Sequence, residues 1–363
     1  MASARAPGGS IHEIPQSSMN RILIIKVTSL GDIVHAQPVV ADLHRAFPAV
    51  TVDWAADSAF AEVLRWNAGI DRVLCAPLRR FKKQRDVHDL KAIAASIAEL
   101  RKVRYDAVID LHGVYKSAII AFLARARSRY GYRSADLGEK GAAFAYTKRF
   151  ARPEGLNAWD GLRKTVGDAL GYPIDSPPEF GLRIPESSTF PEVVKQGAFA
   201  MLFHATSGDT KKWPVERWHR VGQYLADCGI RAALPWGSGS EYAEAVAIAA
   251  GIPDAIVLPQ LTVQEIAQHI HMSTLVAGAD TGFVHLASAL HKPTVMIFTA
   301  TSKRHFGIAV PGVAVSVGDE GDVPSVRDVT EAIESVRPAA MFPMRSLHWN
   351  EAFDKHAGRH STL

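Results

Sequence analysis

The stretch that decides the fold is Ser273–Leu290, STLVAGADTGFVHLASAL. Its apolar beginning, Ser273–Ala277, predicts a buried strand, and the small residues of Gly282–Leu290 predict a helix. Asp280 and Thr281 lie in the turn between the two. The first N–H groups of a helix lack intrahelical partners, and the helix dipole favours negative charge there, so this turn is a candidate phosphate or diphosphate site. The alternative is that Asp280 only caps the helix, as Asp residues often do.

The same alternation of apolar strand and helix occurs in two blocks along the chain. Continuous apolar strands separated by helices are typical of a parallel sheet covered on both faces, so we expect an α/β fold of two doubly wound, Rossmann-like domains. The predicted strands are Arg21–Val27, Val50–Ala55, Asp71–Ala76, Tyr105–Leu111, Phe199–His204, Ala232–Pro235, Ala255–Leu258, Thr274–Ala277 and Thr294–Phe298. The predicted helices are Ile33–Phe47, Ala59–Trp66, His88–Lys102, Tyr115–Ala126, Val215–Asp227, Glu241–Ala250 and Val263–His271.

A proline-rich stretch, Tyr172–Pro178 and on to Pro191, separates the two blocks and favours an extended linker. We therefore expect a first domain at 21–175, a linker at 176–195 and a second domain at 196–337. Residues 1–20 are rich in Ser, Gly and Pro and are expected to form a disordered extension. The tail, 338–363, either packs back on the first domain or stays loose. Two such domains predict a cleft between them, with ligands at the carboxyl ends of the strands.

Composition narrows the function classes. The chain has 363 residues, 47% of them hydrophobic, and a net charge of +4, which is too mild to indicate nucleic-acid binding but suits an acidic substrate. No apolar run is long enough to span a bilayer, and residues 1–20 lack the apolar core of a secretory signal. Two cysteines provide neither a disulfide framework nor metal-ligand spacing, so we expect a cytoplasmic protein without a metal or other cofactor. The first strand is not followed by a complete Gly-x-Gly-x-x-Gly, which disfavours a nicotinamide enzyme.

The turn after the first strand, Thr28–His35, carries the carboxylate of Asp32. At the lip of the predicted cleft, an ionised Asp is placed to accept a proton from an attacking hydroxyl. The alternative is again a helix cap, the more common role of Asp at such a position. His35, one helical turn further on, is more typical of a core histidine.

Two turns of the second block carry polar groups that suit a nucleotide diphosphate. Thr206 and Ser207 offer hydroxyl donors, and Lys211 offers a cation that would stabilise the charge of a departing diphosphate. Glu241, in the next strand-to-helix turn, is placed to accept hydrogen bonds from a ribose diol. The alternatives are a solvated lysine and a first-turn Glu that complements the helix dipole.

The basic cluster Arg79–Arg85, RRFKKQR, follows the end of a predicted strand. Such runs are usually solvated. At the cleft side of the first domain, however, arginines would bind carboxylates or phosphates of a polyanionic acceptor bidentately.

Taken together, these motifs resemble the lipopolysaccharide heptosyltransferase family, in the same order and spacing from Arg21 to Arg337. The resemblance is carried by Lys26–His35, by His204–Thr206 with Lys211–Pro214, by Leu234–Gly237, and by Asp280–Gly282 with His285. It implies a GT-B fold and an inverting, metal-independent glycosyl transfer. The implied donor is ADP-L-glycero-β-D-manno-heptose, and the implied acceptor is the Kdo region of Kdo-bearing lipid A. Because that acceptor is anchored in the cytoplasmic membrane, the resemblance also implies a peripheral protein at the inner, anionic face of this membrane.

The resemblance also implies roles for single residues. It makes Asp32 the base and Lys211 a catalytic diphosphate contact. It assigns the donor to Thr206, Ser207, Lys211, Glu241, Asp280, Thr281, Gly282 and His285, and the acceptor to Ser29, Gly31, Arg79, Arg80, Lys82 and Lys83. The chain departs from the family pattern at Thr299–Ser302, where relatives often have Gly-Pro-Thr-Asp, and at Asn157, where they often have His.

Two other functions remain open from the sequence. A nucleotide-sugar epimerase shares this architecture, although it needs no basic acceptor cluster. A non-catalytic nucleotide-sugar binding protein also fits, although it needs no base at Asp32.

Overall fold

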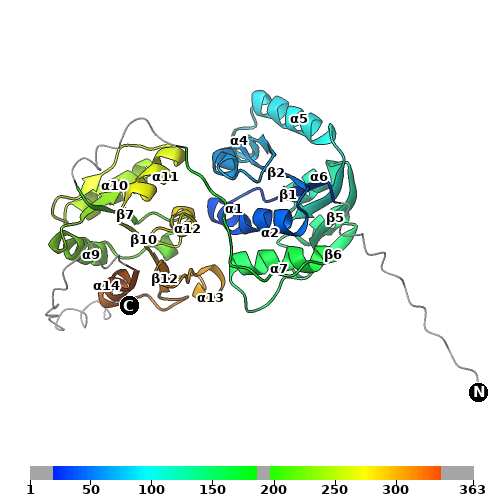
Figure 1. Ribbon diagram of the computed structural model, residues 1–363. Helices are drawn as coiled ribbons and strands as arrows, with labels where there is room; N and C mark the ends of the chain where they lie inside the picture. Colours follow the sequence, from blue (N-terminus) through cyan, green and yellow to red (C-terminus); the bar gives the residue numbers. More distant parts are fainter. Residues whose placement is uncertain (1–18, 186–196, 337–363) are drawn as a thin grey trace, which may run out of the picture.

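The computed structural model describes residues 19–185 and 197–336, which form two parallel α/β halves (Figure 1). The first sheet has the order β3-β2-β1-β4-β5-β6 and the second the order β12-β11-β10-β7-β8-β9, with every neighbouring pair parallel. In each half the strand order reverses next to its first strand, between β1 and β4 and between β7 and β10. At such reversal points the crevice that binds ligands opens. The expected pair of doubly wound sheets is confirmed.

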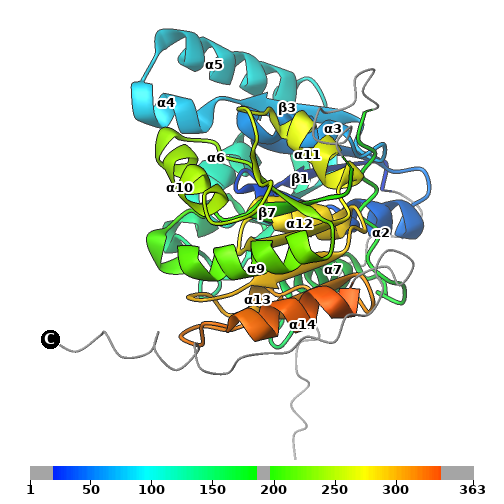
Figure 2. The same cartoon turned by 90° about the vertical axis from the view of Figure 1, so that its left-hand side faces the viewer.

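The elements of the first half follow the predicted alternation. They are β1 (Arg21–Ile25), α1 (Leu30–Ala36), α2 (Pro38–Ala46), β2 (Thr51–Asp57), η2 (Ser58–Phe60), α3 (Ala61–Arg65), β3 (Arg72–Ala76), α4 (Leu78–Gln84), α5 (Val87–Arg101), β4 (Tyr105–Asp110), α6 (Tyr115–Leu123), β5 (Ala126–Tyr132), η3 (Lys140–Ala145), β6 (Lys148–Phe150) and α7 (Ala158–Leu170). Turned by 90°, the molecule has α4 and α5 together at one end and α14 at the other (Figure 2).

The second half repeats the pattern. Its elements are β7 (Phe199–Phe203), η4 (Asp209–Lys211), α9 (Val215–Asp227), β8 (Arg231–Leu234), α10 (Gly239–Ala249), β9 (Ile256–Val257), α11 (Val263–Met272), β10 (Leu275–Ala279), α12 (Gly282–Ala289), β11 (Thr294–Ile297), α13 (Lys303–Phe306), β12 (Ala314–Val317) and α14 (Val326–Val336). The strand and helix expected in Ser273–Leu290 are therefore β10 and α12.

Apolar packing also joins the halves. The central strands are buried, apart from Arg21 at the beginning of β1, because helices cover both faces of each sheet, as their apolar sequences predict. One core cluster contains Val34, Trp159 and Phe180 from the first half together with side chains of β7, β10 and α12. This shared cluster holds α1 against α12, and the two helices face each other between the halves in Figure 1.

Two expectations about secondary structure are wrong. The single helix expected at Ile33–Phe47 is two helices, because Pro38 has no N–H to donate and begins α2 at its first position. The basic cluster, where no helix was predicted, forms helix α4, which ends where Arg85 adopts a left-handed conformation with φ 53°. Arg, Lys and Gln are good helix formers, and this favours the helix. The expectations for residues 1–18, 186–195 and the tail from 338 lie outside the described residues.

Candidate active site

Asp32 lies in the first turn of α1, directly after β1. One carboxylate oxygen accepts hydrogen bonds from the N–H and the hydroxyl of Ser29, both at 3.0 Å, and the other lies 3.0 Å from Nζ of Lys26. Burial alone would raise the pKa of Asp32, but the charge of Lys26 and the hydrogen bond from Ser29 outweigh it and hold the pKa well below its usual range. Ser29, not Asp32, occupies the N-cap position of α1, so the alternative of an Asp32 N-cap is wrong. Asp32, at the third helical position, accepts from the N–H of Ser29 as the acid of a capping box and also presents an ionised carboxylate to the cleft.

Lys26 is the partner that the sequence reasoning missed. Its side chain is buried, and Nζ also donates to the carbonyl oxygen of Leu111, 3.0 Å away at the end of β4. A lysine that ends an apolar strand, in RILIIK, was the available signal. Because buried lysines are nearly always paired, this position predicts a nearby acid.

A cavity of about 250 Å³ opens around Asp32 between the two halves. Lys26 and Arg152 supply positive charge, and His305 of α13 comes from the second half. Burial lowers the pKa of His112 to about 4, so this side chain is neutral at pH 7. The lining residues are Lys26, Asp32, His35, His112, Tyr132, Arg152, Pro153, Leu156, Asn157, Ala158, Gly161, Leu162, Thr165, His305 and Phe306. Arg152 and His112 come from separate loops and His305 comes from α13, so no local motif predicted them.

Asp280, after β10, is the centre of a second charged cluster. Its carboxylate accepts from Nζ of Lys211 and from the hydroxyl of Thr301, both at 2.7 Å, and lies 3.4 Å from Nε2 of His285. Burial would raise the pKa of Asp280, but these three hydrogen bonds hold it well below its usual range. Thr301 belongs to the segment that departs from the family pattern, and its hydroxyl completes this cluster.

The N-terminus of α12 has no side-chain cap. Thr281, not Asp280, occupies the N-cap position, and its side chain accepts no hydrogen bond from the helix. The alternative that Asp280 merely caps this helix is therefore wrong. The helix end retains the character of an anion site, with the Lys211 ammonium held beside it by Asp280.

A cavity of about 380 Å³ extends from this helix end into the second half. Four of the residues predicted to bind the sugar donor line this cavity together: Thr206, Ser207, Glu241 and Thr281. Apolar walls complete it, formed by Phe203, Ala205, Pro235, Trp236, Gly237, Leu261, Val263, Ile266 and Phe283. An apolar slot with a few polar groups at its edges is the common form of a small-molecule or cofactor site.

Two of these polar residues are also engaged in local hydrogen bonds. Oε2 of Glu241 accepts from the N–H groups of Gly237 and Ser238, at 2.7 and 3.2 Å, so Glu241 does serve the first turn of α10. The Thr206 hydroxyl donates to the carbonyl oxygen of Gly208 at 2.7 Å. These bonds fix the turns that shape the cavity.

The two charged clusters meet where α1 packs on α12. A Cβ on Gly282 would lie 2.7 Å from Cβ of Leu30, and one on Gly31 would lie 3.2 Å from the ring of His285. Next to this contact, Nε2 of His35 and Nδ1 of His285 are 2.9 Å apart in a buried hydrogen bond between the halves. The close approach that Gly282 permits is thus to the other half of the protein, and His285 links Asp280 to His35.

The basic residues of α4 lie outside the Asp32 cavity, whose lining includes none of them. Arg80 donates hydrogen bonds from Nε and Nη2 to the carboxylate of Asp89 in α5, and this pair links α4 to α5. The guanidinium of Arg79 lies 5.5 Å from the ring centroid of Phe60. Lys82 and Lys83 are exposed.

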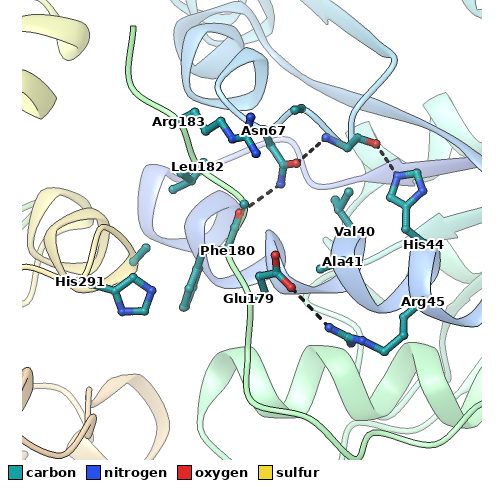
Figure 3. Close-up of a pocket in the computed structure, with 14 residues that line it drawn as sticks. Val40, Ala41, His44, Arg45, Asn67, Glu179, Phe180, Leu182, Arg183 and His291 are labelled. Carbon is teal, nitrogen blue, oxygen red and sulfur yellow. Dashed lines mark hydrogen bonds and ion pairs between the residues drawn. The ribbon is translucent and has the colours of Figure 1, made fainter. Parts of the chain in front are cut away.

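A larger cavity, of about 590 Å³, lies beside the segment that joins the halves and contains none of the candidate catalytic residues (Figure 3). There the amide of Asn67 donates to the side chain of Gln37 at 2.8 Å and to the carbonyl oxygen of Phe180 at 3.1 Å. Glu179 forms an ion pair with Arg45 at 3.5 Å. These contacts anchor the connecting segment to the first half, so this cavity belongs to the joint between the halves.

Within residues 19–185 and 197–336, no group of three or more His, Cys, Asp or Glu side chains is arranged to hold a metal ion. In the same part of the chain, no helix combines the length and the apolar character needed to cross a bilayer.

Two Rossmann-like domains with polar clusters facing a shared cleft are the architecture of the GT-B glycosyltransferases. Residues 93–332 match the profile of glycosyltransferase family 9 (heptosyltransferase). The chain belongs to this family and is therefore a glycosyltransferase. Family membership sets aside the epimerase and the non-catalytic binding protein as alternatives.

Named relatives agree with this assignment. The chain is 30% identical over 289 residues to lipopolysaccharide heptosyltransferase 1 of Escherichia coli K12, covering 79% of this chain and 90% of the relative. It is equally identical to the Pseudomonas aeruginosa protein of the same name, over 81% of that relative. Among solved structures, E. coli heptosyltransferase WaaC with ADP matches with a TM-score of 0.75 at 28% identity, covering 86% of this chain and 99% of the other. The same enzyme with ADP-2-deoxy-2-fluoro heptose matches with a TM-score of 0.72 at 27% identity.

Proposed function

We propose that this protein transfers L-glycero-D-manno-heptose from ADP-heptose to the Kdo residue of Kdo-lipid A, with inversion and without a metal. The observation that carries the proposal is the packing of α1 on α12, which places the turn of the ionised Asp32 next to the turn of Thr281. Thr281 lines the nucleotide-sized cavity of the second half, and Asp280 holds Lys211 beside the same helix end. The solved relatives contain ADP or an ADP-heptose analogue, which supports the choice of donor. We assign the acceptor to the domain at 21–175 and the donor to the domain at 196–337.

In the proposed mechanism, ADP lies in the second half. Phe203 and Phe283, stacked with ring centroids 5.6 Å apart, form part of the apolar wall beside the adenine ring of ADP, and Glu241 accepts hydrogen bonds from the ribose hydroxyls. The diphosphate approaches the first N–H groups of α12, with Thr281 beside it, and Lys211 turns from Asp280 toward it. As the glycosidic C–O bond breaks, these donors stabilise the charge that develops on the diphosphate.

On the other side of the cleft, Asp32 accepts the proton of the acceptor hydroxyl while that oxygen forms its bond to the anomeric carbon. A carboxylate with so low a pKa is a weak base, so we place the proton transfer late, in concert with bond formation. Lys26 and Arg152 give this cavity positive charge, which suits the carboxylates of a Kdo acceptor. The protein would act at the cytoplasmic face of the membrane, where such an acceptor is anchored.

The test is a mass-spectrometric transfer assay with ADP-heptose and a Kdo acceptor from which the acyl chains have been removed. The expected product is heavier by one heptose residue, and its formation should persist in the presence of a chelator. Parallel reactions with ADP-glucose and with an acceptor lacking Kdo serve as controls. Equal transfer in either control, or no product with the full set of substrates, would contradict the assignment of donor or acceptor.

A further inference from the structure

The helix α6 carries an exposed apolar stripe that the proposed chemistry does not use. Tyr115, Ile119 and Phe122 are four and three residues apart, so they share one helix face, and they are between 49% and 57% exposed. Phe144 of η3, which is 54% exposed, extends the stripe, with its ring centroid 5.7 Å from that of Phe122. Soluble proteins seldom expose adjoining large apolar side chains unless the patch binds something.

The stripe continues into an apolar groove between α5 and α6. A cavity of about 150 Å³ lies there, with Ile119 on its edge as well as in the stripe. Its walls are mostly apolar and include Leu74, Leu78, Ile93, Ile97 and Ile120. At the beginning of α5, Val87 and Leu90 are also exposed. The exposed apolar surface at this end of the first half therefore extends over α5, α6 and η3.

Cations border this apolar surface. No residue of α4 is buried, and Arg79, Lys82 and Lys83 project from it as exposed side chains. Lys116 of α6 lies close to them: burial lowers the pKa of Lys116, and the charges of Lys82 and Arg79 lower it further, against the opposing charges of Asp57 and Glu139. Apolar side chains inside a rim of Lys and Arg match the chemistry of an anionic membrane interface.

The same surface begins at the mouth of the cleft. Nζ of Lys116 donates to the hydroxyl of Thr28 at 3.0 Å, and Thr28 precedes the turn that carries Ser29 and Asp32. A bilayer in contact with α6 would thus hold a membrane-anchored acceptor beside the candidate base.

We propose that the α4–α6 face, made of Arg79, Lys82, Lys83, Tyr115, Ile119, Phe122 and Phe144, docks on an anionic bilayer, with its apolar stripe inserted at the boundary between headgroups and acyl chains. Figure 2 shows α4 and α5 at the end of the molecule that this contact would involve. The inference rests on the proposed function for its purpose, because only a membrane-anchored acceptor requires the contact. Its measurement, however, needs no substrate.

The experiment is a sedimentation assay of the full chain with vesicles of phosphatidylcholine alone or mixed with phosphatidylglycerol. The wild type should bind the mixed vesicles and not the neutral ones. The double variant Ile119→Ser, Phe122→Ser should lower the partition coefficient by at least about tenfold, because burial of a single Ile or Phe corresponds to a factor of this size. The matched control Val246→Ser, Val323→Ser removes two exposed apolar side chains of the second half and should bind as the wild type does.

Two further measurements separate the possible outcomes. The double variant should keep its melting temperature and its rate of transfer to the acceptor without acyl chains, so that loss of binding is not loss of folding.

Unchanged vesicle binding by the double variant, or equal binding of the wild type to neutral vesicles, would overturn the proposal. A wild-type dimer that the double variant converts to a monomer would overturn it too, by assigning the stripe to contact between copies. A wild type that transfers no heptose refutes the proposed function but leaves the vesicle result to stand by itself.

Discussion

Each half of the molecule places an acid–lysine pair at the carboxyl end of its sheet, but the two pairs are buried in opposite ways. In the first half the lysine is hidden, with side-chain exposures of 10% for Lys26 and 42% for Asp32. In the second half the acid is hidden, with 26% for Lys211 and 9% for Asp280. The ion pairs themselves are similar, at 3.0 and 2.7 Å.

We infer that the exposed member of each pair meets the substrate and that the buried member positions it. An accessible carboxylate suits the proton of an acceptor hydroxyl, and an accessible ammonium suits a departing diphosphate. Similar local geometry can therefore serve opposite chemistry, depending on which partner faces the cleft.

The largest effect is expected for Asp32→Asn. Loss of the accessible carboxylate should lower turnover by about a hundredfold or more, the usual contribution of a positioned base, while ADP affinity stays near that of the wild type. Steady-state transfer kinetics and calorimetry with ADP measure the two effects.

The chain provides a matched control for this variant in Asp328→Asn. Asp328 accepts from the N–H and the hydroxyl of Ser325, at 2.8 and 2.9 Å, as Asp32 does from Ser29. If both variants lose activity equally, the role of Asp32 is only to cap its helix.

The second effect is expected for Lys211→Ala. Loss of one charge-assisted contact corresponds to about 1.5–3 kcal/mol, so ADP should bind roughly tenfold to a hundredfold more weakly, and transfer should slow as well. Calorimetry measures the affinity. Asp280→Ala should weaken ADP binding in the same direction, because Lys211 loses its buried partner.

The neighbouring lysine is the control for Lys211. Lys212 pairs with Asp209 and Glu244, at 3.0 and 2.8 Å, and Lys212→Ala should leave ADP affinity close to that of the wild type. If Lys211→Ala and Lys212→Ala behaved alike, the assignment of the exposed lysine would be wrong.

A third, smaller effect is expected where the two halves touch. Gly282→Ala places a Cβ 2.7 Å from Cβ of Leu30, and such overpacking destabilises by about 1–3 kcal/mol. Thermal unfolding should show a lower midpoint. Gly239→Ala, at the same first position of α10, meets nothing within 4 Å and should not lower it. Equal midpoints for the two variants would show that the contact between α1 and α12 yields easily.

The smallest effect concerns pH. Burial and the nearby charge of His285 lower the pKa of His35 well below its usual value, so the folded state resists protonation that the unfolded chain accepts near pH 6.5. The folded protein keeps its full free energy of unfolding from this group above about pH 6.5, where His35 is neutral in both states. Below that pH the unfolded chain binds a proton more readily, so the free energy of unfolding decreases as the pH falls toward the folded pKa. Melting temperatures should therefore decrease between about pH 7.5 and pH 5.5, and less steeply for His35→Leu. His271→Leu, at an exposed position, should retain the wild-type slope.

The sequence predicted the centre of each sheet better than its edges. β7 and β10 are continuous apolar runs, β1 is apolar after Arg21, and β4, with the sequence YDAVID, has an apolar centre; buried parallel strands favour this pattern. β5, with the sequence ARSRYGY, contains two arginines, a serine and a glycine, and β6 has only three residues, so neither carries that signal. Helices α7 and α14 were not predicted either.

For the candidate site, turns that directly follow a strand could be predicted and long-range partners could not. Asp32, Thr206, Glu241 and Asp280 all lie one turn beyond a strand, where doubly wound sheets bind ligands. Thr301 reaches Asp280 from a loop 21 residues further along the chain, and His35 meets His285 across 250 residues. Only the folded packing of the halves determines such partners.

The glycine contact between α1 and α12 has a mechanical consequence. The N-termini of these two helices carry the turns of Asp32 and Thr281, so the contact lies next to the candidate base and the candidate diphosphate site. In a rotation of one half about this point, each atom moves in proportion to its distance from the point. The rims of the cleft would therefore swing widely while the acid and the diphosphate site kept nearly the same separation. A fulcrum at this position would let the enzyme open for a bulky acceptor without realigning its reactive groups at every turnover.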